Sequence, residues 1–246
     1  MSAVLSIVIP VWNEEEAIGH VLSDIQLARA SIPHEQPEIG TVEVLVVDDG
    51  STDRTPEIVA RFPGITLICL KHVGYGAALK HGLQQAMGGL LGVMDGDRTY
   101  NPRCFASLCK KILLNEAELV NGSRMHPRSK RPLLRYLSNR MVGTTLRLLS
   151  GKKITDGCTG MLVFDRSILP LVKDCPDDLS FSPALSARLL FSSDLRMAEV
   201  PVDCARRLGH SKLSLLKDTA NCFKQAFSAY ARRRDLRKPQ KVGQTV

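Results

Sequence analysis

The sequence predicts an α/β fold with a mostly parallel central sheet and helices on both of its faces. In the first half of the chain, apolar runs at residues 5–9, 42–47, 65–70 and 90–94 alternate with amphipathic segments. Continuous apolar runs of this length are typical of strands buried on both faces. Strands that alternate with helices tend to pair in parallel, with the helices as crossover connections. Ligands bind such open sheets beyond the carboxyl ends of the strands, so functional residues are expected there.

The segments between the runs carry helix signals. The first begins at Glu14, where three consecutive acids suit the positive end of a helix dipole. The second begins with Thr55 as a cap, followed by Pro56 at the first helical position. The third covers residues 76–87 and ends at Gly88. Strand and helix therefore follow each other regularly through this half.

The second half is less regular. Its predicted elements are two helices at 132–149 and 213–234 and two short strands at 161–164 and 197–202. No internal repeat or clean linker divides the chain. We therefore predict one catalytic domain over residues 1–212 and a basic, amphipathic helical extension over residues 213–246.

Charge is distributed unevenly along the chain, whose net charge is +8. Residues 1–120 hold 9 Lys/Arg and 15 Asp/Glu, a net of −6, whereas residues 121–246 hold 24 and 10, a net of +14. This asymmetry indicates an anionic partner for the second half, namely phosphate groups, an acidic membrane surface or nucleic acid. A solvated basic face with no partner is the alternative. Scarce aromatic residues and the lack of a known nucleic-acid-binding signature argue against nucleic acid.

The seven cysteines include no close pair, which argues against a disulfide framework or a zinc site. They are expected to be reduced thiols in the cytoplasm. No apolar run reaches the roughly 18 residues that a membrane span requires. The sequence therefore predicts a soluble protein, or one peripheral on the cytoplasmic face of a membrane.

An acidic pair, Asp95 and Asp97, follows the fourth apolar run directly. Two carboxylates at a strand's carboxyl end can share a hard divalent cation, and Mg²⁺ or Mn²⁺ often keeps a substrate diphosphate as a further ligand. Such a cation neutralises charge on a departing diphosphate. A plain acidic turn is the alternative, because acidic pairs are common in turns.

Two further motifs end the first and second runs. The first run continues as Ile9-Pro10-Val11-Trp12-Asn13-Glu14, and the second ends as Val47-Asp48-Asp49-Gly50-Ser51-Thr52-Asp53. Together with the acidic pair, they resemble the family-two glycosyltransferases. Asn121-Gly122-Ser123-Arg124, Asp156-Gly157-Cys158-Thr159-Gly160 and the segment from Glu199 to Leu213 extend the resemblance to the polyprenyl-phosphate sugar synthases, the dolichol-phosphate mannose synthase group. The resemblance covers residues 4–213.

The resemblance implies a GT-A fold, a Rossmann-like sheet that binds a nucleotide sugar. It implies donor binding by Pro10, Trp12, Glu14, Asp48, Asp49 and Asp95, with Asp95 and Asp97 as metal ligands and Asp97 catalytic. Trp12 stands where the family usually has Tyr or Phe. Thr99 replaces the Gln that can help to hold the metal, so the donor sugar and base stay open.

A lipid phosphate acceptor needs cations more than a base, because the second pKa of a phosphomonoester is about 6. The candidate acceptor residues are Arg124, Arg135, Arg207 and Lys212, with Ser138 as a hydroxyl donor. They fit the stretch 121–153, which holds nine Lys/Arg and no acid. Asp156 is either a base for a hydroxyl acceptor or, as we favour, the partner that orients these arginines.

The predicted function is an inverting transfer of a sugar from GDP-mannose or a UDP-sugar to a polyprenyl or dolichyl phosphate. The same chemistry on a sugar hydroxyl or small molecule is the first alternative. A protein that binds nucleotide or nucleic acid without turnover is the second. The basic 213–234 helix either lies on an anionic membrane or packs on the core, and a membrane partner subunit or an oligomer would also fit.

Overall fold

A computed structural model describes residues 2–125, 133–192, 194–209 and 215–233. Its strands are β1 (Ala3–Val11), β2 (Ile39–Asp48), β3 (Thr66–Cys69), β4 (Leu90–Met94), β5 (Leu119–Ser123), β6 (Met161–Asp165) and β7 (Met197–Pro201). Its helices are α1 (Ile18–Glu35), α2 (Thr55–Val59), α3 (Tyr75–Gln85), α4 (Cys104–Leu113), α5 (Leu133–Ser150), α6 (Leu169–Lys173), α7 (Phe181–Phe191) and α8 (Leu215–Ala231), with a short 3-10 turn at Arg166–Ile168.

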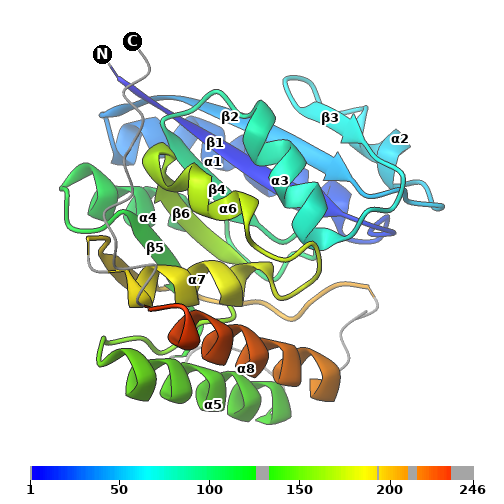
Figure 1. Cartoon of the computed structure of the whole chain (residues 1–246). Helices are drawn as coiled ribbons and strands as arrows, with labels where there is room; N and C mark the ends of the chain where they lie inside the picture. The colour runs from blue at the N-terminus through cyan, green and yellow to red at the C-terminus, as the bar shows by residue number, and fades with distance from the viewer. Residues whose placement is uncertain (1, 126–132, 193, 210–214, 234–246) are drawn as a thin grey trace.

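The strands form a seven-stranded sheet in the order β3-β2-β1-β4-β6-β5-β7 (Figure 1). All pairs are parallel except those of β6, which runs antiparallel to both β4 and β5. The predicted mostly parallel sheet is therefore confirmed. The antiparallel β6 brings Met161 opposite Met94, so the start of β6 lies beside the end of β4.

Helices cover both faces of the sheet, as predicted. One apolar cluster packs α1 and α4 against β1 and β2, with Leu22 and Phe105 fully buried. A second cluster packs α3, α6 and α7 against the other face, with Leu79 and Phe181 fully buried. Residues of β1, β2 and β4 contribute to both clusters, and burial on both faces explains why these runs do not alternate, whereas β3 at the edge of the sheet is only partly buried.

A third cluster lies outside this sandwich, where α5, α7 and α8 pack together (Figure 1). Val142 and Leu146 of α5 meet Cys222 and Ala226 of α8, and Phe191 of α7 completes the contact. The face of α8 that carries Cys222 and Ala226 therefore packs on the protein, whereas Phe227 keeps 53% of its surface exposed. Among the described residues, no helix is both long enough and apolar enough to cross a membrane.

Candidate active site

The carboxyl ends of β1, β2 and β4 surround a cavity of about 450 Å³. Its lining brings together residues from most of the sequence motifs, namely Pro10, Trp12, Glu14, Asp49, His72, Asp95, Asp97 and Arg207. We call this space the donor cavity. It lies where open α/β sheets bind ligands.

The loop after β2 shapes one wall of the donor cavity. Asp49 accepts hydrogen bonds from the backbone N–H groups of Val73 at 2.6 Å and Gly74 at 3.0 Å. Asp48 is buried, accepts from the backbone N–H and the hydroxyl of Ser51, and does not line the cavity. Asp49 therefore fixes the loop before α3, and Asp48 fixes its own turn.

The loop after β1 shapes the opposite wall. The N–H of Asn13 donates to the hydroxyl of Ser51, and the N–H of Glu14 donates to the hydroxyl of Thr55 at 2.9 Å. Thr55 was predicted to cap α2, but it is the first residue of that helix. Its hydroxyl accepts the hydrogen bond from Glu14 in the loop after β1 instead. The ring of Trp12 lies 4.4 Å from that of His72, measured between centroids. These two rings, tilted by 32° to each other, supply an aromatic wall.

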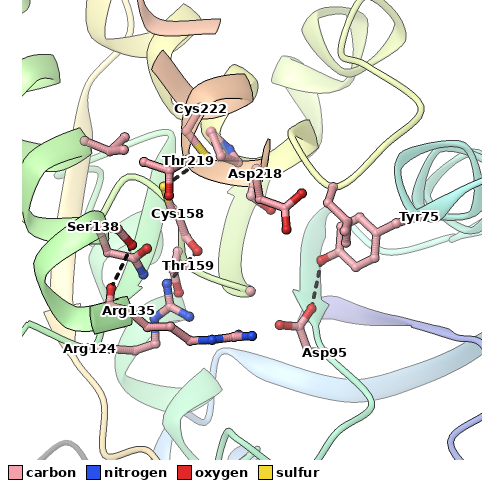
Figure 2. Close-up of a pocket in the computed structure, with 16 residues that line it drawn as sticks. Tyr75, Asp95, Arg124, Arg135, Ser138, Cys158, Thr159, Asp218, Thr219 and Cys222 are labelled. Atoms are coloured by element: carbon pink, nitrogen blue, oxygen red, sulfur yellow. Dashed lines mark hydrogen bonds between the residues drawn. The ribbon is translucent and has the colours of Figure 1, made fainter. Parts of the chain in front are cut away.

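Asp95 and Asp97 lie at the floor of the donor cavity. The hydroxyl of Tyr75 donates to Oδ1 of Asp95 at 2.8 Å (Figure 2). Burial, together with the nearby Asp97 carboxylate, raises the pKa of Asp95 to about 7. Burial and Asp95 raise the pKa of Tyr75, so its hydroxyl stays a donor. The site thus holds two mutually repelling carboxylates that a cation would stabilise.

Arg207 connects the loops that follow β1 and β4. Its guanidinium donates to Oε1 of Glu14 at 2.6 Å and lies 3.5 Å from Oδ2 of Asp97. Arg207 lines the donor cavity, away from the other residues predicted to bind the acceptor. Its charge therefore lies beside the acidic pair.

A second, smaller pocket of about 150 Å³ adjoins the donor cavity. The two spaces share Tyr75, Asp95, Leu179 and Asp218. Arg124, Arg135 and Ser138 lie across the smaller pocket from Tyr75 and Asp95, and Asp218, Thr219 and Cys222 of α8 complete its wall (Figure 2). We call this space the arginine pocket. The hydroxyl of Ser138 donates to the carbonyl of Arg135 at 3.2 Å.

Arg124 is fixed by a buried carboxylate. Asp156 is fully buried and accepts from Nε of Arg124 at 2.7 Å and from Nη2 at 3.0 Å. It also accepts from the backbone N–H groups of Arg124 and Cys158. The ion pair with Asp156 raises the pKa of Arg124 despite its burial, so the guanidinium stays charged. Both oxygens of Asp156 are thus engaged in holding Arg124.

Glu199 holds Asp156 in turn. Its carboxylate accepts from the N–H and the hydroxyl of Thr155, at 2.8 and 2.7 Å, and from the N–H of Asp156 at 2.8 Å. Burial raises the pKa of Glu199. The motif residues of β7, the 155–160 loop and Arg124 therefore form one connected network.

Comparison with known proteins identifies the family of this chain. The model described as Glycosyl transferase family 2 matches residues 6–171. The chain belongs to glycosyl transferase family 2. The glycosyltransferase is similar to dodecaprenyl-phosphate galacturonate synthase of Rhizobium johnstonii, at 30% identity over 86% of this chain and 62% of the relative. It is similar to dolichyl-phosphate hexose transferase of Haloferax volcanii, at 31% identity over 85% of this chain and 86% of the relative.

Several curated relatives are longer than this glycosyltransferase. The chain spans 62% of the Rhizobium protein and 51% of hexosyltransferase Agl6 of Haloferax volcanii. The fold is also that of glucosyl-3-phosphoglycerate synthase of Mycobacterium tuberculosis, solved with Mn²⁺ and UDP. That structure has a TM-score of 0.67 and 21% identity and covers 97% of this chain and 82% of its own. This likeness confirms the GT-A fold.

The acidic pair of the glycosyltransferase suits a hard cation that a substrate helps to hold. Within the described residues, no group of three or more His, Cys, Asp or Glu side chains is placed to hold a metal by itself. The pKa of Asp95 is raised, as expected for a buried carboxyl group beside a second carboxylate. The two carboxylates therefore fit a metal site in which a substrate diphosphate supplies further ligands. Asp95 and Asp97 are the residues that would hold the ion.

The structure brings most of the predicted site residues of the glycosyltransferase into two adjoining spaces. Lys212 lies outside the described residues. Sequence reasoning did not select Tyr75, Tyr100 or Asp218 as site residues. Tyr100 accepts from the N–H of Gly160 at 2.7 Å and so supports the floor of the site. A signal for Tyr75 existed, because the segment His72-Val73-Gly74-Tyr75-Gly76 resembles a family motif that has Lys at the position of Tyr75, whereas nothing in the sequence marked Asp218.

Proposed function

We propose that this glycosyltransferase is an inverting enzyme that moves a sugar from a nucleoside diphosphate to a polyprenyl phosphate. The observation that carries the proposal is the arginine pocket, which joins the donor cavity at Asp95 and Tyr75. A sugar bound at this junction would have the diphosphate on one side and the acceptor on the other. In that arrangement, the acceptor oxygen attacks the anomeric carbon in line as the diphosphate leaves.

The donor side of the proposal assigns roles to the strand-end residues. Trp12 and the backbone at Pro10 face the base, and Asp49 fixes the wall beside them. Asp95 and Asp97 would hold Mg²⁺ or Mn²⁺, which would supply positive charge to the departing diphosphate. Arg207 holds Glu14 and lies 3.5 Å from Oδ2 of Asp97, so it would help to fix the position of Asp97. Removing Asp97 should therefore abolish turnover.

The acceptor side relies on cations. A phosphomonoester is mostly dianionic at pH 7, because its second pKa is about 6, and needs positioning rather than deprotonation. Arg124 and Arg135 line the arginine pocket and bring two positive charges to a phosphate there, with Nε and Nη2 of Arg124 already held by Asp156. Asp156 holds Arg124 through both carboxylate oxygens, which favours its role as an orienting partner. Ser138 adds a hydroxyl on the same side of the pocket.

The names of the curated relatives support the acceptor class. The Rhizobium and Haloferax relatives are named for dodecaprenyl phosphate and dolichyl phosphate. Their sugars differ, galacturonate in one name and an unspecified hexose in the other, so the donor is left as a class. A lipid acceptor would place this enzyme at the cytoplasmic face of a membrane.

The test is a release assay for nucleoside diphosphate. Purified protein with Mg²⁺ or Mn²⁺ receives GDP-mannose, UDP-glucose, UDP-N-acetylglucosamine or UDP-galacturonate, each with and without a short polyprenyl phosphate. Release that the lipid phosphate stimulates, and that Asp97→Ala removes, is the expected result. Wild-type turnover in Asp97→Ala would refute the metal-site assignment. Release that ignores the lipid phosphate would refute the acceptor.

A hydroxyl acceptor is the second candidate, and Asp218 favours it. Its carboxyl group belongs to both spaces and lies near the junction (Figure 2). A hydroxyl nucleophile needs a base, whereas a phosphate acceptor would be repelled by a neighbouring carboxylate. Comparing the two acceptor classes in an Asp218 variant separates these functions.

A further inference from the structure

Helix α5 carries an exposed apolar stripe that no described element covers. Five of its side chains expose between 48% and 76% of their surface, namely Leu133, Leu134, Leu137, Met141 and Leu148. Successive residues of a helix lie about 100° apart around its axis, which places all five within a sector of about 100°. Contiguous exposed apolar residues on one helix face mark an interaction surface more often than scattered ones do.

The charges beside this stripe are all positive. Arg140 and Arg147 are exposed and fall next to it on the helix circumference. The α5 sequence contains no Asp or Glu. An apolar stripe with basic residues beside it and no acids is typical of a helix that lies in the interface of an anionic membrane. A protein partner would have to supply both a matching apolar face and acidic groups.

The opposite face of α5 belongs to the protein and to the arginine pocket. Val142 and Leu146 are buried against α7 and α8, and Arg135 and Ser138 line the pocket. Helix α5 lies at the edge of the molecule, on the far side of α8 from the sheet (Figure 1). One helix therefore separates the proposed acceptor site from the exposed stripe.

We propose that α5 lies in the surface of an anionic lipid bilayer, with its leucine stripe among the acyl chains. This proposal rests on the proposed function and identifies an anionic membrane as the surface to which the enzyme binds. A polyprenyl phosphate could then keep its chain in the bilayer while its phosphate reaches Arg124 and Arg135 across the width of a single helix. The basic helix α8, for which the sequence left a membrane contact and packing on the core as alternatives, has Cys222, Ala226 and Ala229 buried against α5 and α7.

The first experiment measures binding to vesicles by sedimentation. Vesicles of phosphatidylcholine with and without phosphatidylglycerol are mixed with the wild type and with the double variant Leu137→Gln, Met141→Gln. The matched control is Leu27→Gln, Met87→Gln, which removes two apolar side chains at other surfaces that are at least as exposed. The stripe variant should lose about tenfold or more of its partition into anionic vesicles, and the control variant should bind like the wild type.

A second pair of variants tests the charges. Arg140→Gln, Arg147→Gln should weaken binding to phosphatidylglycerol vesicles and make it less sensitive to salt. The control Arg61→Gln, Arg103→Gln removes two exposed arginines elsewhere and should bind like the wild type. Equal losses in the two pairs would mean that net charge alone attracts the protein, which would overturn the proposal.

Turnover measurements with two acceptors distinguish failure of the membrane proposal from failure of the proposed function. With a short, water-soluble isoprenyl phosphate, the stripe variant should match the wild type, because its substitutions do not line the pocket. With a long polyprenyl phosphate in vesicles, it should lose activity in step with binding. Wild-type activity on both acceptors overturns the membrane role of α5 and leaves the transferase intact. A wild-type dimer that the stripe variant converts to monomer would assign the stripe to a second copy.

Discussion

Gly160 lies directly against the carboxyl group of Asp95. A β-carbon at position 160 would lie 1.8 Å from Oδ2 of Asp95 and 2.4 Å from its Cγ. The N–H of Asp95 donates to the carbonyl of Gly160 at 3.1 Å, which fixes the two backbones side by side. The first acid of the pair can occupy its position only because residue 160 has no side chain.

Gly160→Ala should therefore inactivate the enzyme without unfolding it. The added methyl group must displace the Asp95 carboxyl group, and a displacement of about 1 Å at a reacting centre costs roughly a hundredfold in rate. The measurement is turnover at saturating donor and metal, with circular dichroism to verify folding. Gly89→Ala is the control, because a β-carbon there meets nothing within 4 Å. Turnover of Gly160→Ala within a few fold of wild type would contradict the assigned position of Asp95.

Asp156→Asn should destabilise the protein strongly. It would leave Arg124 charged, largely buried and without its carboxylate partner, and breaking a buried pair on one side costs about 3–5 kcal/mol. The measurement is the free energy of unfolding from urea denaturation. The control is Glu116→Gln, which removes the exposed pair with Lys111 and should cost less than about 1 kcal/mol. A similar small loss in both variants would show that Arg124 and Asp156 are not paired in solution.

The central strands could be predicted because burial on both faces requires a continuous run of apolar residues. Strands β1, β2 and β4 are apolar runs with both faces covered, and the motif residues follow them immediately. Strand β5 ends in Asn121-Gly122-Ser123, so no apolar run marks it. Helix α7 is buried nearly all round and lacks the one-sided pattern that identifies a surface helix.

The donor cavity was more predictable than the arginine pocket for a physical reason. Carboxyl ends of parallel strands meet at one edge, so sequence position fixes the neighbourhood of Asp49 and Asp95. The arginine pocket depends on how α5 and α8 pack on α7. The burial of Cys222 and Ala226 sets the rotation of α8, which turns Asp218 toward the pocket. No local pattern encodes that rotation.

Cys158 and Cys222 offer a test of this packing. Their sulfur atoms lie 3.5 Å apart, with the Cys158 thiol donating to Cys222. This hydrogen bond lowers the pKa of Cys222, whereas the bond and burial raise the pKa of Cys158. Cys222 should ionise first, and diamide should then join the two sulfurs, the two thiol hydrogens passing to the reagent. Peptide mass spectrometry should find the 158–222 link.

Attack of Cys222 on diamide should begin at a pH below that needed by an ordinary thiol, because the thiolate is the reacting species. Cys222→Ser is the control and should abolish the link. A link between Cys158 and any other cysteine would contradict the placement of α8. Reduction with dithiothreitol should restore whatever activity the link removes, since no atom other than hydrogen is lost.

Asp218→Asn distinguishes the two acceptor classes. A general base contributes about 10²–10⁴-fold to the attack of a hydroxyl group, so a hydroxyl-directed enzyme should lose that factor. A phosphate-directed enzyme needs no base, and removing a negative charge from its pocket should leave turnover intact or lower the KM for the acceptor. The measurement is kcat and KM with a polyprenyl phosphate and with a sugar acceptor, in parallel.

Asp178→Asn provides a matched carboxyl-to-amide change, because Asp178 lines only the donor cavity. The lipid phosphate proposal expects Asp218→Asn to keep kcat with polyprenyl phosphate while Asp97→Ala loses it. A loss of a hundredfold or more in kcat for Asp218→Asn alone would make Asp218 the base. The arginines of the smaller pocket would then orient a polar acceptor whose hydroxyl group reacts.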